Sequence, residues 1–197
     1  MRTAYRLAIC ALLPLVASAL PARDVELVPR IGGRFGGEMA DEATNRPVSL
    51  DSGVAFGLAM DVALAGDGRY LRLAWSRQRT EADLPDPALP PRRLRLDSLH
   101  FGGVYRWTHR AAQPYVTAGV GLTVIGAEDS EVFPSGSIGA GVRWPAGAPV
   151  ALWIEGRGIA VFETGRASLV CGPGCALGLS GSGLFQTEVM AGLSIRL

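Results

Sequence analysis

Strict alternation of large apolar residues with small or polar ones is the feature that most limits the fold of this chain. Over 54–64, every second residue is large and apolar, and Ala, Gly or Asp fills the positions between. Successive side chains of a β-strand point to opposite faces, so this period of two predicts a strand with one apolar face. The pattern recurs over 115–124, 137–144 and 185–197, and no helical period competes with it.

Four further segments read as strands with less regular alternation, which brings the predicted number to eight: 25–36, 70–79, 94–107 and 150–162. The connections between the eight strands alternate in length. Long ones are predicted at 37–52, 80–93, 126–135 and 163–183, and short ones at 65–69, 108–113 and 145–148. A closed antiparallel meander with its long loops at one end has this layout, which is typical of membrane-spanning barrels.

The alternation alone fits two kinds of eight-stranded barrel. A soluble, lipocalin-like carrier directs its large apolar residues inward, whereas a membrane barrel directs them toward lipid. Here the second face is mostly Gly, Ala and Ser with single charges, which suits a narrow lumen. Aromatic residues near the short connections predict an interfacial girdle: Tyr70, Tyr105, Trp107, Tyr115, Trp144 and Trp153. We therefore expect an all-β, up-and-down transmembrane barrel. The direction of Phe56, Leu58 and Met60 separates the two cases.

The first residues predict a secretory signal rather than part of the fold. Arg2 and Arg6 precede an apolar run over 7–16, and small residues follow at 17–19. This run is shorter than the roughly 20 residues that a membrane-spanning helix needs. We expect 1–22 to be a cleaved signal peptide and 23–197 to form the barrel domain.

The composition argues against a nucleic-acid partner and a cofactor, and it predicts one disulfide. Nineteen basic residues, all of them Arg, balance eighteen acidic ones, so no basic surplus predicts a nucleic-acid partner. No phosphate loop, dinucleotide fingerprint or metal-ligand spacing is present, and no cofactor is expected. Cys171 and Cys175 form the stretch CGPGC, far from both histidines. In an exported chain this pair predicts a disulfide in a surface loop.

Several stretches carry a resemblance to a known family: QPYVTAGVGLTVIGA at 113–127, GSIGAGVRW at 136–144, ALWIEGRGIAVF at 151–162 and MAGLSIRL at 190–197. With them the chain resembles the small eight-stranded outer-membrane barrels, which include the transmembrane domain of outer-membrane protein A and the opacity proteins. The resemblance implies a Gram-negative outer membrane, both termini in the periplasm, and a last strand read by the barrel-assembly machinery. Leu197 departs from the terminal Phe that is usual in that signal.

With the small or polar face of each strand pointing inward, eleven charged residues are predicted to point into the lumen. They are Glu26, Arg30, Arg34, Asp61, Arg72, Arg106, Arg143, Glu155, Arg157, Glu188 and Arg196. Buried charges persist when they are paired or hydrated, so we expect Glu155 and Glu188 to meet arginines of neighbouring strands in a network that plugs the lumen. Because basic residues outnumber acidic ones, a small anion-selective pore is the alternative.

Two other groups suggest contacts or chemistry. Arg77, Arg79 and Arg95 fall near the long-loop ends on the outer face, where they would meet lipopolysaccharide phosphates, unless the strands simply protrude into water there. Ser98 and His100 share a face, which raises the alternative of a lipid A-modifying hydrolase. No third catalytic member is evident beside them. We expect a non-enzymatic protein with a structural or surface-interaction role through its long loops, whose extracellular partner the residues do not identify.

Overall fold

The computed structural model describes most of the chain after residue 24. The described residues are 25–41, 47–65, 67–82, 92–107, 111–126, 129–145, 147–162, 168–172, 175–178 and 183–197. The predicted signal peptide, 1–22, lies outside them. Within these ranges, no helix is long and apolar enough to cross a membrane.

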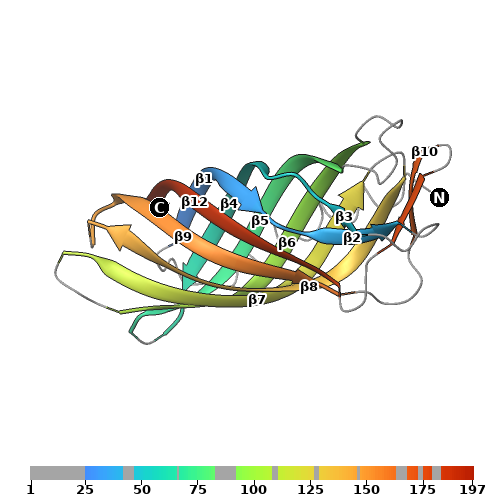
Figure 1. Cartoon of the computed structure of the whole chain (residues 1–197). Helices are drawn as coiled ribbons and strands as arrows, with labels where there is room; N and C mark the ends of the chain where they lie inside the picture. Colours follow the sequence, from blue (N-terminus) through green and yellow to red (C-terminus); the bar gives the residue numbers. More distant parts are fainter. Residues whose placement is uncertain are drawn as a thin grey trace.

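Eight long strands close into a barrel, as the alternation predicts (Figure 1). Each pairs antiparallel with the barrel strands before and after it, and the first pairs with the last. Their bounds are β1 (Val25–Phe35), β4 (Gly53–Ala63), β5 (Arg69–Ala82), β6 (Arg92–Arg106), β7 (Gln113–Gly126), β8 (Ser130–Trp144), β9 (Val150–Val161) and β12 (Leu184–Arg196). Leu197 N donates to Val25 O at 2.8 Å, so the two ends of the barrel sequence lie side by side at the short-connection end.

The large apolar residues of the wall point outward. Phe56 and Leu58 are 41% and 44% exposed, whereas Ala55 and Ala59, which alternate with them, are fully buried. Further outward apolar residues extend around the barrel: Ile31, Val54, Leu73, Leu99, Phe101, Val120, Leu122, Ile138, Leu152, Ile154, Val189 and Leu193. Soluble monomers do not expose an apolar surface of this extent. The lipocalin-like alternative is therefore wrong, and the barrel is of the transmembrane kind.

One predicted long connection is wrong. β7 ends at Gly126 and β8 begins at Ser130, so the two strands are joined by 127–129 rather than by 126–135. Pro134, a residue type that rarely occurs within a paired strand, lies inside β8. The register of β8 with β9 begins at Ser135, and beyond it Phe162 N donates to the carbonyl of Pro134 at 2.8 Å. The missing N–H of Pro134 therefore lies where this pairing ends, and such a position tolerates proline.

Two of the predicted loops contain strands that form a second sheet. β2 (Glu38–Asp41), β3 (Pro47–Ser49), β10 (Ser168–Gly172) and β11 (Cys175–Gly178) pair in the order β10-β11-β2-β3 at the long-connection end (Figure 1). Strands this short carry too little alternation to be recognised. Cys171 and Cys175 belong to the β10–β11 hairpin, but their side chains lie outside the described part, so the disulfide stays a prediction.

At the long-connection end the barrel reverses its polarity. On β6, Leu94 and Leu96 point inward and are buried, whereas Leu99 and Phe101 point outward. The buried apolar residues at this end form one cluster, here called the apolar cap: Val48, Leu50, Ala82, Leu94, Leu96, Ile125, Phe133, Ile159, Val161 and Leu184. At the long-connection end the wall is therefore built like that of a soluble barrel, and elsewhere like that of a membrane barrel.

Candidate functional site

Charged side chains fill the lumen below the apolar cap, beginning at the short-connection end. Glu26 on β1 accepts hydrogen bonds from Arg106 and from Nε of Arg143, the latter at 2.5 Å. Arg106 also donates to Asp61, which links this group to the next level. Its guanidinium lies 4.0 Å above the ring of Tyr70. The residues come from five different strands, because alternation directs every second side chain of each strand inward.

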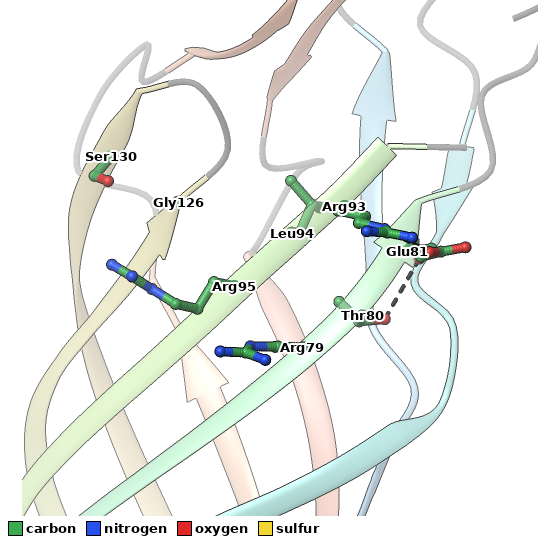
Figure 2. A pocket seen from close by; sticks show the side chains of 8 residues that line it. All are labelled: Arg79, Thr80, Glu81, Arg93, Leu94, Arg95, Gly126 and Ser130. Carbon is green, nitrogen blue, oxygen red and sulfur yellow. Dashed lines mark hydrogen bonds and ion pairs between the residues drawn. The ribbon is translucent and has the colours of Figure 1, made fainter. Parts of the chain in front are cut away.

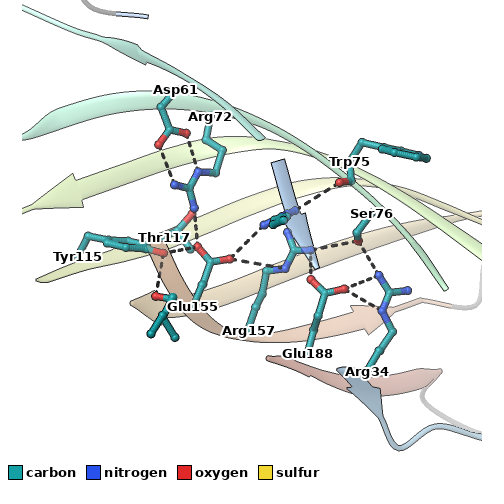
Figure 3. A network of polar contacts seen from close by, with 12 residues as sticks. Arg34, Asp61, Arg72, Trp75, Ser76, Tyr115, Thr117, Glu155, Arg157 and Glu188 are labelled. Carbon is teal, nitrogen blue, oxygen red and sulfur yellow. Dashed lines mark hydrogen bonds and ion pairs between the residues drawn. The ribbon is translucent and has the colours of Figure 1, made fainter. Parts of the chain in front are cut away.

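Arg72 joins two carboxylates at the centre of the lumen (Figure 3). Its Nε and NH2 donate to both oxygens of Asp61 at 2.6 and 2.7 Å, and its NH1 donates to Glu155 at 2.5 Å. The hydroxyl of Tyr115 donates to the same oxygen of Glu155 at 2.9 Å. Arg30 reaches the other oxygen at 3.5 Å. Glu155 thus accepts three donors in a buried position, as a stable buried carboxylate requires.

Glu188 organises the level nearest the long-connection end. Arg157 donates to it at 2.5 Å, and Arg34 donates to it through Nε and NH2 at 2.9 and 2.6 Å (Figure 3). Both arginines also donate to the hydroxyl of Ser76. β12 is flanked by β9 and β1, so Glu188 pairs with arginines of neighbouring strands, as expected.

Glu155 departs from that expectation. Its partners Arg72 and Arg30 lie on β5 and β1, neither of which adjoins β9, so these pairs cross the lumen. An eight-stranded barrel is narrow enough for an arginine to span. Among the described lumen residues, six buried arginines face four buried carboxylates: Arg30, Arg34, Arg72, Arg106, Arg143 and Arg157 against Glu26, Asp61, Glu155 and Glu188. Arg196, also predicted for the lumen, is partly exposed at the short-connection end.

Two aromatic residues assigned to the girdle lie in the lumen instead. Tyr115 and Trp153 are buried and stacked, with ring centroids 6.1 Å apart, and Arg72 lies over both rings. They share the inward register of Glu155, and flat rings cover the guanidinium faces that the carboxylates leave free. Tyr70, which packs beside Arg106, is also not part of the girdle. The outward aromatic residues at the short connections are Tyr105, Trp107 and Trp144.

A layer of hydroxyl groups contains the Ser98 and His100 pair. Ser98 is bonded to Thr123 at 3.1 Å, and His100 Nε2 is bonded to Ser135 at 3.0 Å. No hydrogen bond joins Ser98 to His100, and His100 Nδ1 has no partner within the described residues. A serine nucleophile needs a base in contact with it and a third group that orients the base. Ser98 has neither, and although His100 contacts Ser135, no described residue orients the His100 ring through Nδ1. The described residues also contain no cluster of metal-binding side chains.

On the outer face, β5 and β6 carry three successive rungs of charged residues above the apolar band, here called the charged ladder. The rungs pair Arg77 with Asp97, Arg79 with Arg95, and Glu81 with Arg93. Arg77 and Arg95 both bind Asp97, at 2.6 and 2.9 Å, and Arg93 donates to Glu81 at 3.3 Å. Figure 2 shows Arg79, Glu81, Arg93 and Arg95 of this ladder. A pocket of about 600 Å³ opens between this ladder and the ends of β7 and β8. Sequence reasoning missed Arg93, because it fell in a predicted loop.

An apolar outer wall, a charged lumen and strands joined in sequence order define a small eight-stranded transmembrane β-barrel, and solved structures of this class are similar to it. Neisserial surface protein A matches with a TM-score of 0.60 and 11% identity over 88% of this chain and 97% of its own. OprG, an outer membrane protein from Pseudomonas aeruginosa, matches with 0.62 and 13% over 89% and 96%.

The same comparison finds an enzyme with a related fold. The outer membrane protease OmpT from Escherichia coli matches with a TM-score of 0.50 and 10% identity over 91% of this chain and 99% of its own. At these identities the similarities establish the fold alone. No protein-family model matches the sequence, and no curated protein matches it at a significant level.

Proposed function

We propose that this protein is a non-enzymatic outer-membrane barrel that is closed to ions and solutes and acts through its long-loop end. In the proposed orientation the short-connection end, with both ends of the barrel sequence, faces the periplasm, and the sheet of β2, β3, β10 and β11 faces the outside. The last strand, β12, is the segment that the barrel-assembly machinery would recognise. The extracellular partner is not identified by the described residues.

The single observation that carries the proposal is the Arg72 bridge between Asp61 and Glu155. These side chains are almost fully buried, and their hydrogen bonds cross the lumen from β4 and β5 to β9. Above them lie the Glu188 level and then the apolar cap, whose own side chains offer an ion no ligands in place of its water; the buried amides of Gln78 and Gln186 lie at the same level. Charged pairs that satisfy each other in this way support a structural lumen rather than a transport pathway.

Conductance in planar bilayers tests the closed lumen. We expect purified protein, whose folded state is verified by its gel mobility before insertion, to give no steady current at moderate voltage. The second candidate function is a small pore. The surplus of two arginines among the buried lumen residues supports it, because this charge would make an open barrel anion-selective. A stable anion-selective current in the wild-type protein would overturn the proposal in favour of that pore.

The non-enzymatic part has its own test. A hydrolase acting on lipid A would need Ser98 and His100 in contact and open to substrate, whereas both are buried below the apolar cap. We expect lipid A from a host that expresses the protein to keep its mass. Loss of an acyl chain that is restored by Ser98→Ala or His100→Ala would establish the enzyme instead.

A further inference from the structure

We propose that the pocket beside the charged ladder binds a phosphate group carried by a lipid headgroup. The inference rests on the outer-membrane placement proposed above, but not on a closed lumen. The pocket lies between the long-connection ends of β5, β6, β7 and β8, and three arginines line it: Arg79, Arg93 and Arg95 (Figure 2). Among the described residues, the ladder contains four arginines and two carboxylates, a surplus of two positive charges.

The middle rung of the ladder is the reason to expect an anion. Residues directly opposite on antiparallel strands stabilise a sheet when their charges are opposite and destabilise it when they are alike. The rungs on either side of the middle one obey this rule, since Arg77 faces Asp97 and Arg93 faces Glu81. In the middle rung Arg79 faces Arg95. A bound anion would supply the negative charge that this rung lacks.

The carboxylates of the described residues do not supply that charge. Arg95 leans toward Asp97, which it shares with Arg77, and Arg93 is directed to Glu81. Arg79 is exposed, and it makes no ion pair with any described residue. A guanidinium binds phosphate through paired N–H groups, which makes two opposed arginines a suitable pair of ligands.

The shape of the pocket depends on a glycine at its wall. On β7, Gly126 lies opposite Arg95, and on β8 Ser130 lies opposite Gly126. A Cβ at Gly126 would meet the hydroxyl of Ser130 at 3.0 Å, so any larger residue would fill the space between Arg95 and Ser130. With glycine there, the serine hydroxyl is a third donor on the side of the pocket away from Arg79.

The depth of the ladder points to a lipid as the carrier of the phosphate. The next outward residues below the Arg77–Asp97 rung are Trp75 and Leu99, and Leu99 and Phe101 are exposed on the apolar wall. The change from apolar to charged residues marks the surface of the hydrocarbon layer, where headgroup phosphates lie. Arg77 also stacks over Trp75 at 5.4 Å, as residues at such an interface do.

Native mass spectrometry of the full-length protein in detergent tests the site with two probes: lipid A carrying both phosphates, and the same lipid A with both phosphates removed. We expect the wild type to bind the phosphorylated lipid preferentially. Arg79→Gln and Arg95→Gln should each weaken that binding about tenfold, since each removes charge-assisted hydrogen bonds. Arg69→Gln is the matched control, because Arg69 is an exposed arginine of β5 at the opposite end of the barrel. Equal binding by all four proteins would overturn the proposal.

Arg79→Glu separates binding from folding. It converts the middle rung into an opposite-charge pair with Arg95 like its neighbours, so the lipid-free variant should melt at or above the wild-type temperature while losing the phosphorylated lipid. Unchanged lipid binding by this variant would refute the site. Inorganic phosphate that competes with the lipid at equal phosphate concentration would refute the lipid as its source. Neither result depends on conductance.

Discussion

Arg34 and Glu188 face each other across the seam where the first and last strands close the barrel. The two residues are register partners of β1 and β12, and Nε and NH2 of Arg34 both donate to one oxygen of Glu188. Both side chains are buried. Strand pairing and lumen charge are therefore satisfied by the same contact, so the barrel cannot open at this seam without uncovering an ion pair in a narrow interior.

Replacing Glu188 with Gln should destabilise the barrel strongly. Arg34 and Arg157 would lose their shared carboxylate, and breaking a buried pair on one side costs on the order of 3 kcal/mol. The free energy of unfolding in urea, measured in lipid vesicles, checks this. Glu81→Gln is the matched control, because Glu81 pairs with the exposed Arg93 and such surface pairs contribute about 0.5 kcal/mol. Equal unfolding free energies for both variants would mean that Glu188 is hydrated.

Tyr115→Phe removes one hydroxyl from the centre of the network and leaves the ring beneath Arg72. The lost hydrogen bond to Glu155 should cost about 2 kcal/mol, as is typical when one partner is charged. Tyr105→Phe, at an exposed position of the outer wall, should leave the unfolding midpoint unchanged. A Tyr115 variant as stable as the wild type would show that Glu155 is satisfied by arginine alone.

Gly141 and Gly156 make a second matched pair. Gly141 is the register partner of Tyr115, and a Cβ there would lie 2.3 Å from the tyrosine hydroxyl oxygen, whereas a Cβ at Gly156 meets nothing within 4 Å. We expect Gly141→Ala to displace the ring and cost about 2 kcal/mol, in the range of overpacked cores. Gly156→Ala should fold and unfold like the wild type. The reverse order of stabilities in urea would contradict the packing described for the lumen.

Closure of the sheet predicts unusual resistance to detergent. Because each of the eight barrel strands is paired on both sides, unheated protein should keep its β-type circular dichroism in sodium dodecyl sulfate and migrate differently from the boiled sample. Identical mobility before and after boiling, together with solubility in buffer without detergent, would contradict a membrane barrel.

Cys171 and Cys175 should be oxidised in protein isolated without reductant. Their hairpin, β10–β11, is part of the sheet at the long-loop end, which faces an oxidising compartment in the proposed orientation. Mass spectrometry after alkylation should find neither thiol modified until a reductant is added. Because the ring closed by this bridge is small, replacing both cysteines with Ser should leave the barrel folded.

The alternation of side chains along each strand explains what could be predicted from the sequence. A strand directs alternate residues to opposite faces, so the register that exposed Phe56 also placed Arg72 and Glu155 in the lumen. The partner of each charge was not predictable, since 83 residues separate Arg72 from Glu155 and only the stagger of the closed barrel brings them to one level. Trp153 was wrongly assigned to the girdle because its proximity to a short turn was given more weight than its position two residues from Glu155, on the same face of β9.

The long-loop end was harder to predict for a different reason. Strands of three to five residues, such as β3 and β10, are too short for a period of two to emerge. The start of β8 was predicted as part of a loop, and it contains Pro134, which a strand tolerates where one of its edges is not fully paired. Arg79 and Arg95 were both recognised in the sequence as possible phosphate ligands. Recognising that Arg79 and Arg95 face each other, however, required the pairing register of β5 and β6.

The reversal of polarity along β6 fixes the depth at which the protein sits. If the barrel sank, the Arg77–Asp97 rung would enter hydrocarbon, and if it rose, Leu99 and Phe101 would be exposed to water. Both displacements are unfavourable, and a rigid closed sheet cannot tilt one strand to relieve them. The surrounding bilayer must therefore adjust its own thickness to the height of the apolar wall, so the protein imposes a local membrane thickness on its lipid neighbours.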